Sequence, residues 1–121
     1  MSKKLAIILV NWNSYELTND TLQSLYQTSF QDYDIICVDN ASTDESLNQL
    51  RTNHNNVIIL TCDQNTGFTG GNNKGMQYAI QQGYVYTLLL NNDVAVEDER
   101  KVDLEGKRAY CPRVKKGRWF S

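Results

Sequence analysis

Four short apolar segments, separated by more polar stretches, organise the first 93 residues of the chain. They are residues 5–10 (LAIILV), 34–39 (DIICVD), 56–60 (NVIIL) and 84–90 (YVYTLLL). Each segment is too short for a typical helix, is rich in β-branched or aromatic residues, and is nearly continuous in its hydrophobicity. This pattern predicts strands of a parallel sheet that are covered on both faces.

Between these segments, apolar residues recur at helical spacing and predict three helices. The stripes consist of Leu17, Leu22 and Leu25, of Leu47 and Leu50, and of Met76, Ala79 and Ile80. Ser42 and Glu45 have the spacing of a capping box, which predicts the start of the second helix. The resulting β-α-β-α-β-α-β order predicts an α/β fold with helices on both faces of a mostly parallel sheet.

Length and composition exclude several classes of protein. A chain of 121 residues with 40% hydrophobic content can form one compact domain. Its three cysteines form no CxxC pair and His54 is the only histidine, so we expect neither a zinc site nor a Cys–His nucleophile. The first apolar run stops at Asn11 without a cleavage site. We therefore expect a cytoplasmic protein, with a peripheral position at the inner face of the membrane as the alternative.

The charges divide the chain into two parts. Residues 1–93 contain four basic side chains and nine acidic ones, whereas the last 28 residues contain eight basic and five acidic ones. The charge balance therefore changes near residue 93. A natural basic tail for an anionic membrane or nucleic acid is one interpretation of the last residues. The formal charge of −2 gives no reason to expect a nucleic-acid partner.

Polar side chains follow three of the predicted strands. Asn11 ends the first strand, Asp39 ends the second, and residues 91–93 (NND) follow the fourth. Ligands of open parallel sheets bind beyond the carboxyl ends of the strands, near the point where the strand order reverses. One acidic residue at a strand end is usually part of a turn or a helix cap. Three polar strand ends together favour a binding site.

The chemistry of the two carboxylates suggests different roles. Mg²⁺ and Mn²⁺ are typically held by one or two carboxylates together with substrate phosphates and water, which makes Asp93 a candidate metal ligand. Few basic residues precede Asp93, so a cation would have to neutralise the phosphates of a diphosphate substrate. Asp39 cannot face phosphate, but it can accept hydrogen bonds from a base N–H or from ribose hydroxyls.

The glycine-rich stretch at residues 65–75 (NTGFTGGNNKG) is less specific. Its glycines do not have the spacing of the dinucleotide-binding motif, and no Gly-Lys-Ser/Thr follows as in a Walker A loop. A close approach of the backbone to another group, or several positive φ angles, would explain it.

Four blocks together resemble, in order and spacing, the nucleotide-binding half of a family 2 glycosyltransferase with the GT-A fold. The blocks are AIILVNWNS, IICVDNASTDES, NTGFTGGNNKG and LLLNNDVAVED, and the resemblance covers residues 4–97. It is strongest to the rhamnosyltransferase-like members, which build bacterial surface polysaccharides. The resemblance implies that Asp39 contacts the base, Asn92 the ribose or phosphate region, and Asp93 a divalent metal, Mn²⁺ or Mg²⁺. It also implies that Asn11, Gly71, Asn72 and Asn73 lie around the nucleotide.

The resemblance implies a nucleotide-diphosphate sugar as donor, a saccharide or lipid-linked acceptor, and inverting transfer. After residue 97 the chain departs from the family pattern. The resemblance therefore implies a nucleotide-sugar-binding half-domain over residues 1–97 and an atypical charged tail over residues 98–121, which we expect to be the end of a truncated or altered gene product. The acceptor-binding half and its general base are not recognised, so the catalytic residue is unknown. Asp44 and Asp63 are weak substitutes for it. Whether the chain is an active enzyme stays open. The alternatives are a non-catalytic nucleotide-sugar-binding module and a sugar-nucleotide nucleotidyltransferase, and an open sheet edge predicts self-association.

Overall fold

The computed structural model describes residues 5–92, 95–102 and 108–115, the last two segments by their backbone alone. Residues 5–92 alternate between strands and helices, which confirms the predicted α/β order. The elements are β1 (Leu5–Asn11), α1 (Tyr15–Tyr26), β2 (Tyr33–Asp39), α2 (Ser46–Asn53), β3 (Ile58–Thr61), α3 (Gly67–Gln81) and β4 (Tyr86–Leu89).

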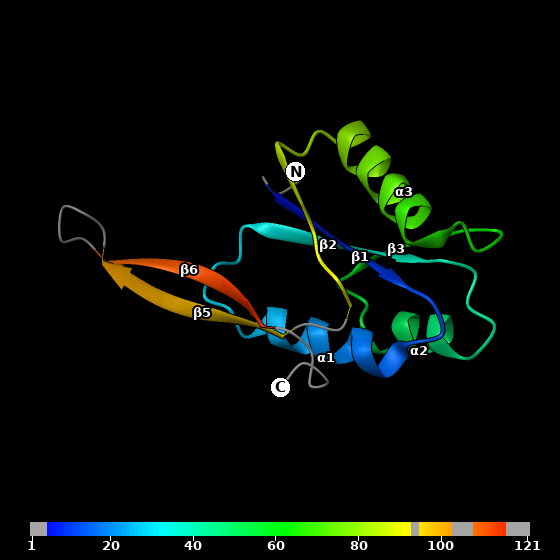
Figure 1. The fold of residues 1–121 in the computed structure, drawn as a ribbon, viewed down its shortest axis with the longest axis horizontal. Helices are drawn as coiled ribbons and strands as arrows, with labels where there is room; N and C mark the ends of the chain where they lie inside the picture. Colours follow the sequence, from blue (N-terminus) through cyan, green and yellow to red (C-terminus); the bar gives the residue numbers. More distant parts are fainter. Residues whose placement is uncertain (1–4, 93–94, 103–107, 116–121) are drawn as a thin grey trace.

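The four strands form one parallel sheet in the order β3-β2-β1-β4 (Figure 1). The chain therefore adds strands on one side of β1 and then crosses to the other side to form β4. The strand order reverses between β1 and β4, which is where open sheets of this kind bind ligands. In the register of β1 and β2, Asn11 lies opposite Asp39.

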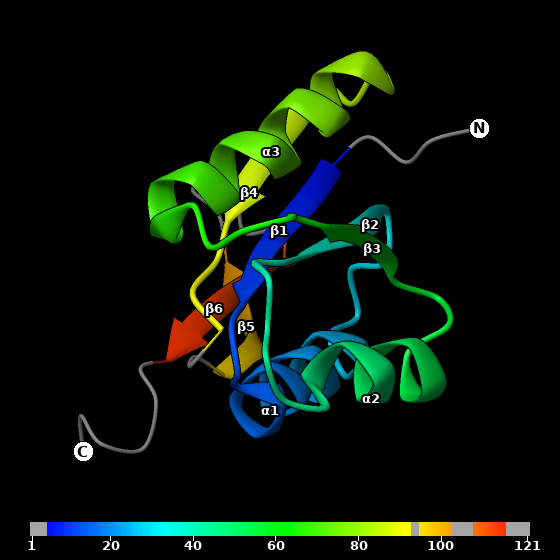
Figure 2. The same cartoon turned by 90° about the vertical axis from the view of Figure 1, so that its right-hand side faces the viewer.

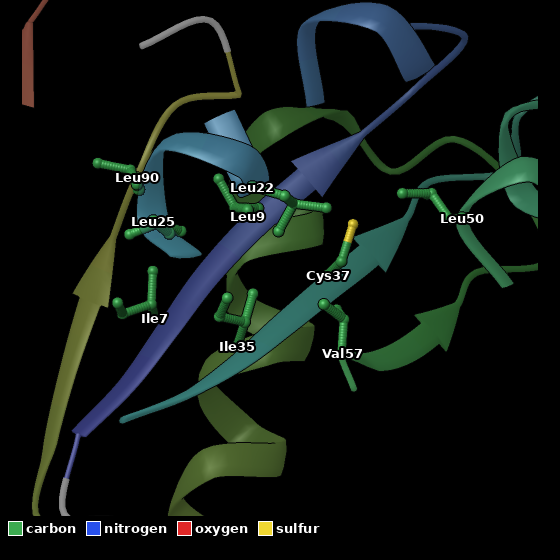
Figure 3. Packing of buried hydrophobic residues seen from close by; sticks show 9 residues of the cluster. All are labelled: Ile7, Leu9, Leu22, Leu25, Ile35, Cys37, Leu50, Val57 and Leu90. Carbon is green, nitrogen blue, oxygen red and sulfur yellow. The ribbon is translucent and has the colours of Figure 1, made fainter. Parts of the chain in front are cut away.

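Helices cover both faces of the sheet, with α3 on one side and α1 and α2 on the other (Figure 2). Alternate residues of β1 point to opposite faces of the sheet. Ile7 and Leu9 pack against α1 and α2, and Ala6 and Ile8 belong to the apolar cluster between the sheet and α3. Figure 3 shows the first cluster, to which β1, β2 and α1 contribute. The strand is apolar without interruption because both of its faces are buried.

Two glycines allow α3 to lie close to the central strands. A Cβ at Gly71 would lie 2.8 Å from Val10 Cγ1, and one at Gly75 would lie 2.6 Å from Ile8 Cγ2. Both distances are too short for real carbon contacts, so a side chain at either position would push the helix away from β1. Part of the glycine-rich stretch is thus explained by helix-to-sheet packing.

The strand β4 departs from the expectation that all four strands are covered on both faces. All four residues of β4 are exposed, and Ile80 on α3, expected in the core, is 73% exposed. The reason is the position of β4 at the edge of the sheet, with β1 on one side and no described strand on the other.

The predicted start of the second helix is also wrong. Helix α2 begins at Ser46, and its N-cap residue Glu45 makes no side-chain cap hydrogen bond. The Asp44 carboxylate accepts a hydrogen bond from the Ser46 N–H at 2.9 Å. The side chain and the backbone N–H of Ser46 together lower the pKa of Asp44. Ser42 is instead bonded to Asp39.

His54 is buried between α1 and α2, with an exposed fraction of 1%. Its Nε2 lies 2.8 Å from Asn19 Oδ1 and its Nδ1 lies 2.7 Å from the Tyr26 hydroxyl. An amide oxygen can only accept, so Nε2 carries the hydrogen and Nδ1 accepts from Tyr26. Burial lowers the pKa of His54, which favours this neutral form.

Two further strands lie beyond Asn92, mostly within the region predicted as an atypical charged tail. Strands β5 (Ala95–Val102) and β6 (Arg108–Lys115) are antiparallel, and β5 lies against α1. Pro112 lies opposite Asp98. A proline is tolerated there because both strands of a two-stranded sheet are edge strands. Among the described residues, no helix is long and apolar enough to cross a membrane.

Candidate functional site

Three predicted polar residues lie at the carboxyl edge of the sheet. Asn11 and Asp39 are the last residues of β1 and β2 and are partners in the register of these strands. Asn92 follows β4, on the other side of β1. The sheet therefore brings the three residues to the point where the strand order reverses.

Asp39 is 2% exposed, and its carboxylate is held by three hydrogen bonds. Oδ1 accepts from Asn11 Nδ2 at 2.9 Å and from the Ser42 hydroxyl at 2.7 Å. Oδ2 accepts from the Ser42 backbone N–H at 3.1 Å. A carboxylate offers about four acceptor positions, so these contacts leave one position, on Oδ2.

Asn11 is fully buried, and both ends of its amide are bonded within the protein. Nδ2 donates to Asp39 and, at 3.3 Å, to the Ser42 hydroxyl. Oδ1 accepts from the Thr18 hydroxyl at 2.7 Å. The structure therefore places Asn11 behind Asp39, where it fixes the carboxylate.

Asn92 is anchored to α1 through both its backbone and its side chain. Its carbonyl oxygen accepts from the Thr21 hydroxyl at 2.9 Å, and its Nδ2 donates to Thr18 Oγ1 at 3.1 Å. The amide nitrogen and oxygen are on opposite branches of the side chain, so Oδ1 points away from Thr18. Asn92 also lines an open cavity at this edge of the sheet.

The loops after β1 and β2 are bonded to each other. The Asn13 side-chain oxygen accepts from the backbone N–H groups of Thr43 at 2.7 Å and Asp44 at 3.2 Å. Asn13 and Ala41 have positive φ angles of 50° and 63°. Such angles are uncommon for residues other than glycine and often occur at functional sites. The turn at Ala41 is what returns Ser42 to Asp39.

Asn40 fixes the start of α3 to the end of β2. Its Oδ1 accepts from the Thr66 N–H at 3.0 Å, and its Nδ2 donates to the Gly67 carbonyl at 2.8 Å. Gly67 has a φ of 77°, which a larger residue would adopt only with strain. The glycine-rich stretch is therefore held against the carboxyl edge of the sheet.

A cavity of about 270 Å³ lies between these elements. Trp12 and Phe68 line it and are 49% and 56% exposed. The cavity-lining residues are Val10, Trp12, Ser14, Asn40, Asn65, Gly67, Phe68 and Asn92. Two aromatic rings and several amides suit a flat, polar-edged molecule such as a nucleoside. None of the lining residues is basic.

The remaining predicted residues lie differently. Gly71 packs under Val10, and Asn72 is 4% exposed with a buried Oδ1 that accepts no hydrogen bond. Asn73 is exposed and lines a separate groove with Cys62 and Asp63. Contact of Gly71, Asn72 and Asn73 with a nucleotide stays a prediction. Asp93 lies outside the described residues.

The metal site stays a prediction. Within the described part of the chain, no group of three or more His, Cys, Asp or Glu side chains could hold a metal ion. Asp93, the predicted ligand of Mn²⁺ or Mg²⁺, lies outside the described residues. One or two carboxylates are enough for these cations when substrate phosphates and water complete the coordination.

Sequence reasoning missed Thr18 and Ser42. Thr18 has no exposed surface and lies on the buried side of α1, while the neighbouring Leu17 is only partly buried. A hydroxyl within a helix that carries an apolar stripe does not stand out in the sequence. Ser42 was assigned to a helix cap, and only the turn at Ala41 shows its real partner.

The sequence of the chain is similar to known proteins. The sequence matches glycosyl transferase family 2 over residues 6–104. The chain belongs to this family. It is 31% identical over 100 residues to the hexosyltransferase Agl10 of low-salt glycan biosynthesis in Haloferax volcanii. It is 38% identical over 72 residues to a poly(ribitol-phosphate) β-glucosyltransferase of Bacillus spizizenii. The family 2 resemblance is confirmed.

Solved structures of glycosyltransferases share the fold. S. aureus TarS superposes with a TM-score of 0.64 at 24% identity, over 78% of this chain and 28% of TarS. A Pyrobaculum calidifontis mannosyltransferase in complex with GDP-Man and Mn²⁺ superposes with a TM-score of 0.62 at 16% identity, over 78% of this chain and 29% of that enzyme. The predicted GT-A architecture is confirmed.

The chain corresponds to a minor part of these relatives. The matched region covers 82% of this chain and 31% of Agl10, and 55% of this chain and 11% of the B. spizizenii enzyme. The family and the fold are therefore established for this family 2 chain, whereas the donor, the acceptor and the reaction remain to be proposed.

Proposed function

We propose that this family 2 chain is the donor-binding part of a glycosyltransferase that uses a UDP- or dTDP-sugar together with Mn²⁺ or Mg²⁺. The whole enzyme would transfer the sugar with inversion to a saccharide or lipid-linked acceptor in bacterial surface polysaccharide synthesis, with a rhamnosyl donor as one candidate. The observation that carries the proposal is Asp39, fixed at the strand reversal with one acceptor position left.

The bonding of Asp39 favours a uracil or thymine base. These bases present one donor, N3–H, between two carbonyl groups, which matches the single position on Oδ2. Guanine presents two adjacent donors and would need both carboxylate oxygens, although Oδ1 already accepts from Asn11 and Ser42. TarS has been crystallised with UDP and with UDP-GlcNAc, and the P. calidifontis enzyme with GDP-Man. Both kinds of base thus occur on this fold, so the choice needs a direct test.

The cavity lined by Asn40, which follows Asp39 in the sequence, supports contacts to the rest of the donor. The rings of Trp12 and Phe68 can stack on a base or cover the apolar face of a sugar. The Asn92 amide oxygen can accept from a ribose hydroxyl. Asp93 would hold the cation, and a bound cation would stabilise the charge of the departing diphosphate. No described residue of the cavity lining is basic, which supports a cation in this role.

Calorimetry with UDP, dTDP and GDP, each with and without Mn²⁺, tests the donor class. We expect UDP or dTDP to bind at least about tenfold more tightly than GDP, which corresponds to one well-formed hydrogen bond. Mn²⁺ should increase the affinity for UDP but not for UMP. Asp93→Ala should remove this increase and leave UMP binding unchanged. Equal UDP affinities of wild type and Asp93→Ala in Mn²⁺ would refute the metal assignment.

The role of Asp39 is tested with UMP, which needs no metal. Asp39→Asn keeps the shape of the side chain and should weaken UMP binding by about 1.5–3 kcal/mol, the usual contribution of a charge-assisted hydrogen bond. Asp63→Asn, in the separate groove, is the matched control and should bind UMP as the wild type does. An unchanged UMP affinity of a folded Asp39→Asn variant would leave Asp39 as a turn residue only.

A non-catalytic nucleotide-sugar-binding module is the second candidate function. One observation favours it: the Asp44 carboxylate accepts a hydrogen bond from the Ser46 N–H at the start of α2 and Asp63 lines the separate groove, so neither described candidate for the general base lines the donor cavity. Donor turnover by the chain, measured as release of UDP from UDP-sugars in the presence of saccharide acceptors, distinguishes the two. Binding without turnover supports the module.

A further inference from the structure

Thr18 connects two of the strand ends that form the site. It lies in the first turn of α1 and is fully buried. Its hydroxyl oxygen accepts a hydrogen bond from Asn92 Nδ2 at 3.1 Å and donates to Asn11 Oδ1 at 2.7 Å. The hydroxyl donates its single hydrogen to Asn11 and accepts from Asn92 through a lone pair of its oxygen, so the two bonds can form together.

The three hydrogen bonds that link Asn92 to Asp39 through Thr18 and Asn11 all run in the same direction. Asn92 donates to Thr18, Thr18 donates to Asn11, and Asn11 donates to the Asp39 carboxylate at 2.9 Å. Bonds aligned in this way polarise one another and strengthen towards the charged acceptor. The donation from Thr18 also sets the orientation of the Asn11 amide, because it holds the oxygen and leaves the nitrogen facing Asp39.

We infer that Thr18 is a positioning residue that couples the two ends of the nucleotide site through its hydroxyl. In the proposed function Asp39 is at the base end and Asn92 at the diphosphate end, and Thr18 links their side chains through Asn11. Thr18 has no exposed surface, so it would act on a bound nucleotide only through its hydrogen-bond partners. Loss of its hydroxyl should therefore weaken both ends together. This inference rests on the proposed function.

Three variants test the coupling in binding experiments. Thr18→Val removes the hydroxyl at nearly constant shape and should weaken UMP and UDP–Mn²⁺ binding by about five- to tenfold each. Thr18→Ser keeps the hydroxyl and should bind both within roughly twofold of the wild type. The control is Thr28→Val: Thr28 is 5% exposed, and its hydroxyl donates to the Leu25 carbonyl at 2.8 Å, beyond the far end of α1. This variant should lose stability but not affinity.

The side-chain amide signals of Asn11 and Asn92 in NMR spectra of the free protein give a readout that needs no ligand. Both signals should shift in Thr18→Val and neither should shift in Thr28→Val. If the wild type binds no UMP, the proposed function fails, while this comparison still tests the coupling. The inference is overturned if Thr18→Val leaves the Asn11 signal unchanged, or if Thr28→Val loses as much affinity as Thr18→Val at equal stability.

Discussion

Strands β1 and β4 come from similar apolar runs, but their surroundings differ. Residues Ala6, Ile8 and Leu9 of β1 have no exposed surface, whereas Leu88 and Leu89 of β4 are 42% and 45% exposed. The central strand is paired on both sides and covered by helices on both faces. Among the described strands, the edge strand β4 pairs with β1 only. Position in the strand order, and not hydrophobicity, decides which apolar run forms the core.

The polar residues follow the same rule. At the end of β1, Asn11 is buried and every bond of its amide is made within the protein. At the end of β4, Asn92 is partly buried and lines the open cavity. The central strand therefore supplies the fixed support of the site, and the edge strand supplies the groups that can face a ligand.

The largest expected effect separates the two strands directly. Leu9→Ala should lower the free energy of unfolding by about 2–5 kcal/mol, because it leaves a cavity in a fully buried cluster. Leu89→Ala removes the same atoms from a half-exposed site and should cost less than about 1 kcal/mol. Urea unfolding followed by circular dichroism measures both. Equal losses would show that β4 is covered in solution.

A second effect concerns the layer between β1 and α3. Gly75→Ala would place a Cβ 2.6 Å from Ile8 Cγ2 and should destabilise the fold by about 1–3 kcal/mol through overpacking. Gln77→Ala, at an exposed position of the same helix, is the control. An unchanged midpoint for Gly75→Ala would show that α3 can move away from β1 at little cost.

A third effect depends on pH. The pKa of His54 is lowered by burial, so the folded protein prefers the neutral imidazole. The stabilisation is complete above the ordinary pKa of 6.5 and is lost as the pH falls below it towards the lowered folded value. The loss cannot exceed about 1.4 kcal/mol per pH unit for one proton. Between neutral and mildly acidic pH, the free energy of unfolding should change less with pH in His54→Gln than in the wild type. The same pH dependence in both proteins would contradict the assignment.

The smallest effect on stability, but a clear one on assembly, is expected at the sheet edge. The exposed apolar side chains there are Ile80, Val85, Tyr86, Leu88 and Leu89. An edge strand with such side chains favours pairing with another chain. Leu89→Lys should reduce concentration-dependent light scattering and change the free energy of unfolding by less than about 0.5 kcal/mol. A wild type that stays monomeric at high concentration would contradict this expectation.

The sequence was sufficient for the order of elements and for the polar strand ends, because run length and hydrophobicity are local properties. It could not show that β4 lies at an edge, since strand order depends on how the crossovers pack. The roles of Ser42 and Thr18 also escaped prediction. Ser42 reaches Asp39 only through the positive φ of Ala41, and Thr18 meets Asn92 across 74 residues of chain. The β5–β6 hairpin was hidden by the charges in its strands.

The most direct test of the account is to map UMP binding by NMR on the labelled chain. The account predicts that backbone amide shifts concentrate at Trp12, at residues 39–42, at Gly67 and Phe68, and at Asn92, around the carboxyl ends of β1, β2 and β4. Residues of β4 itself and of the groove at Cys62 should change little. Shifts centred on that groove or on the exposed face of β4, with none at Asp39, would contradict the proposed nucleotide site.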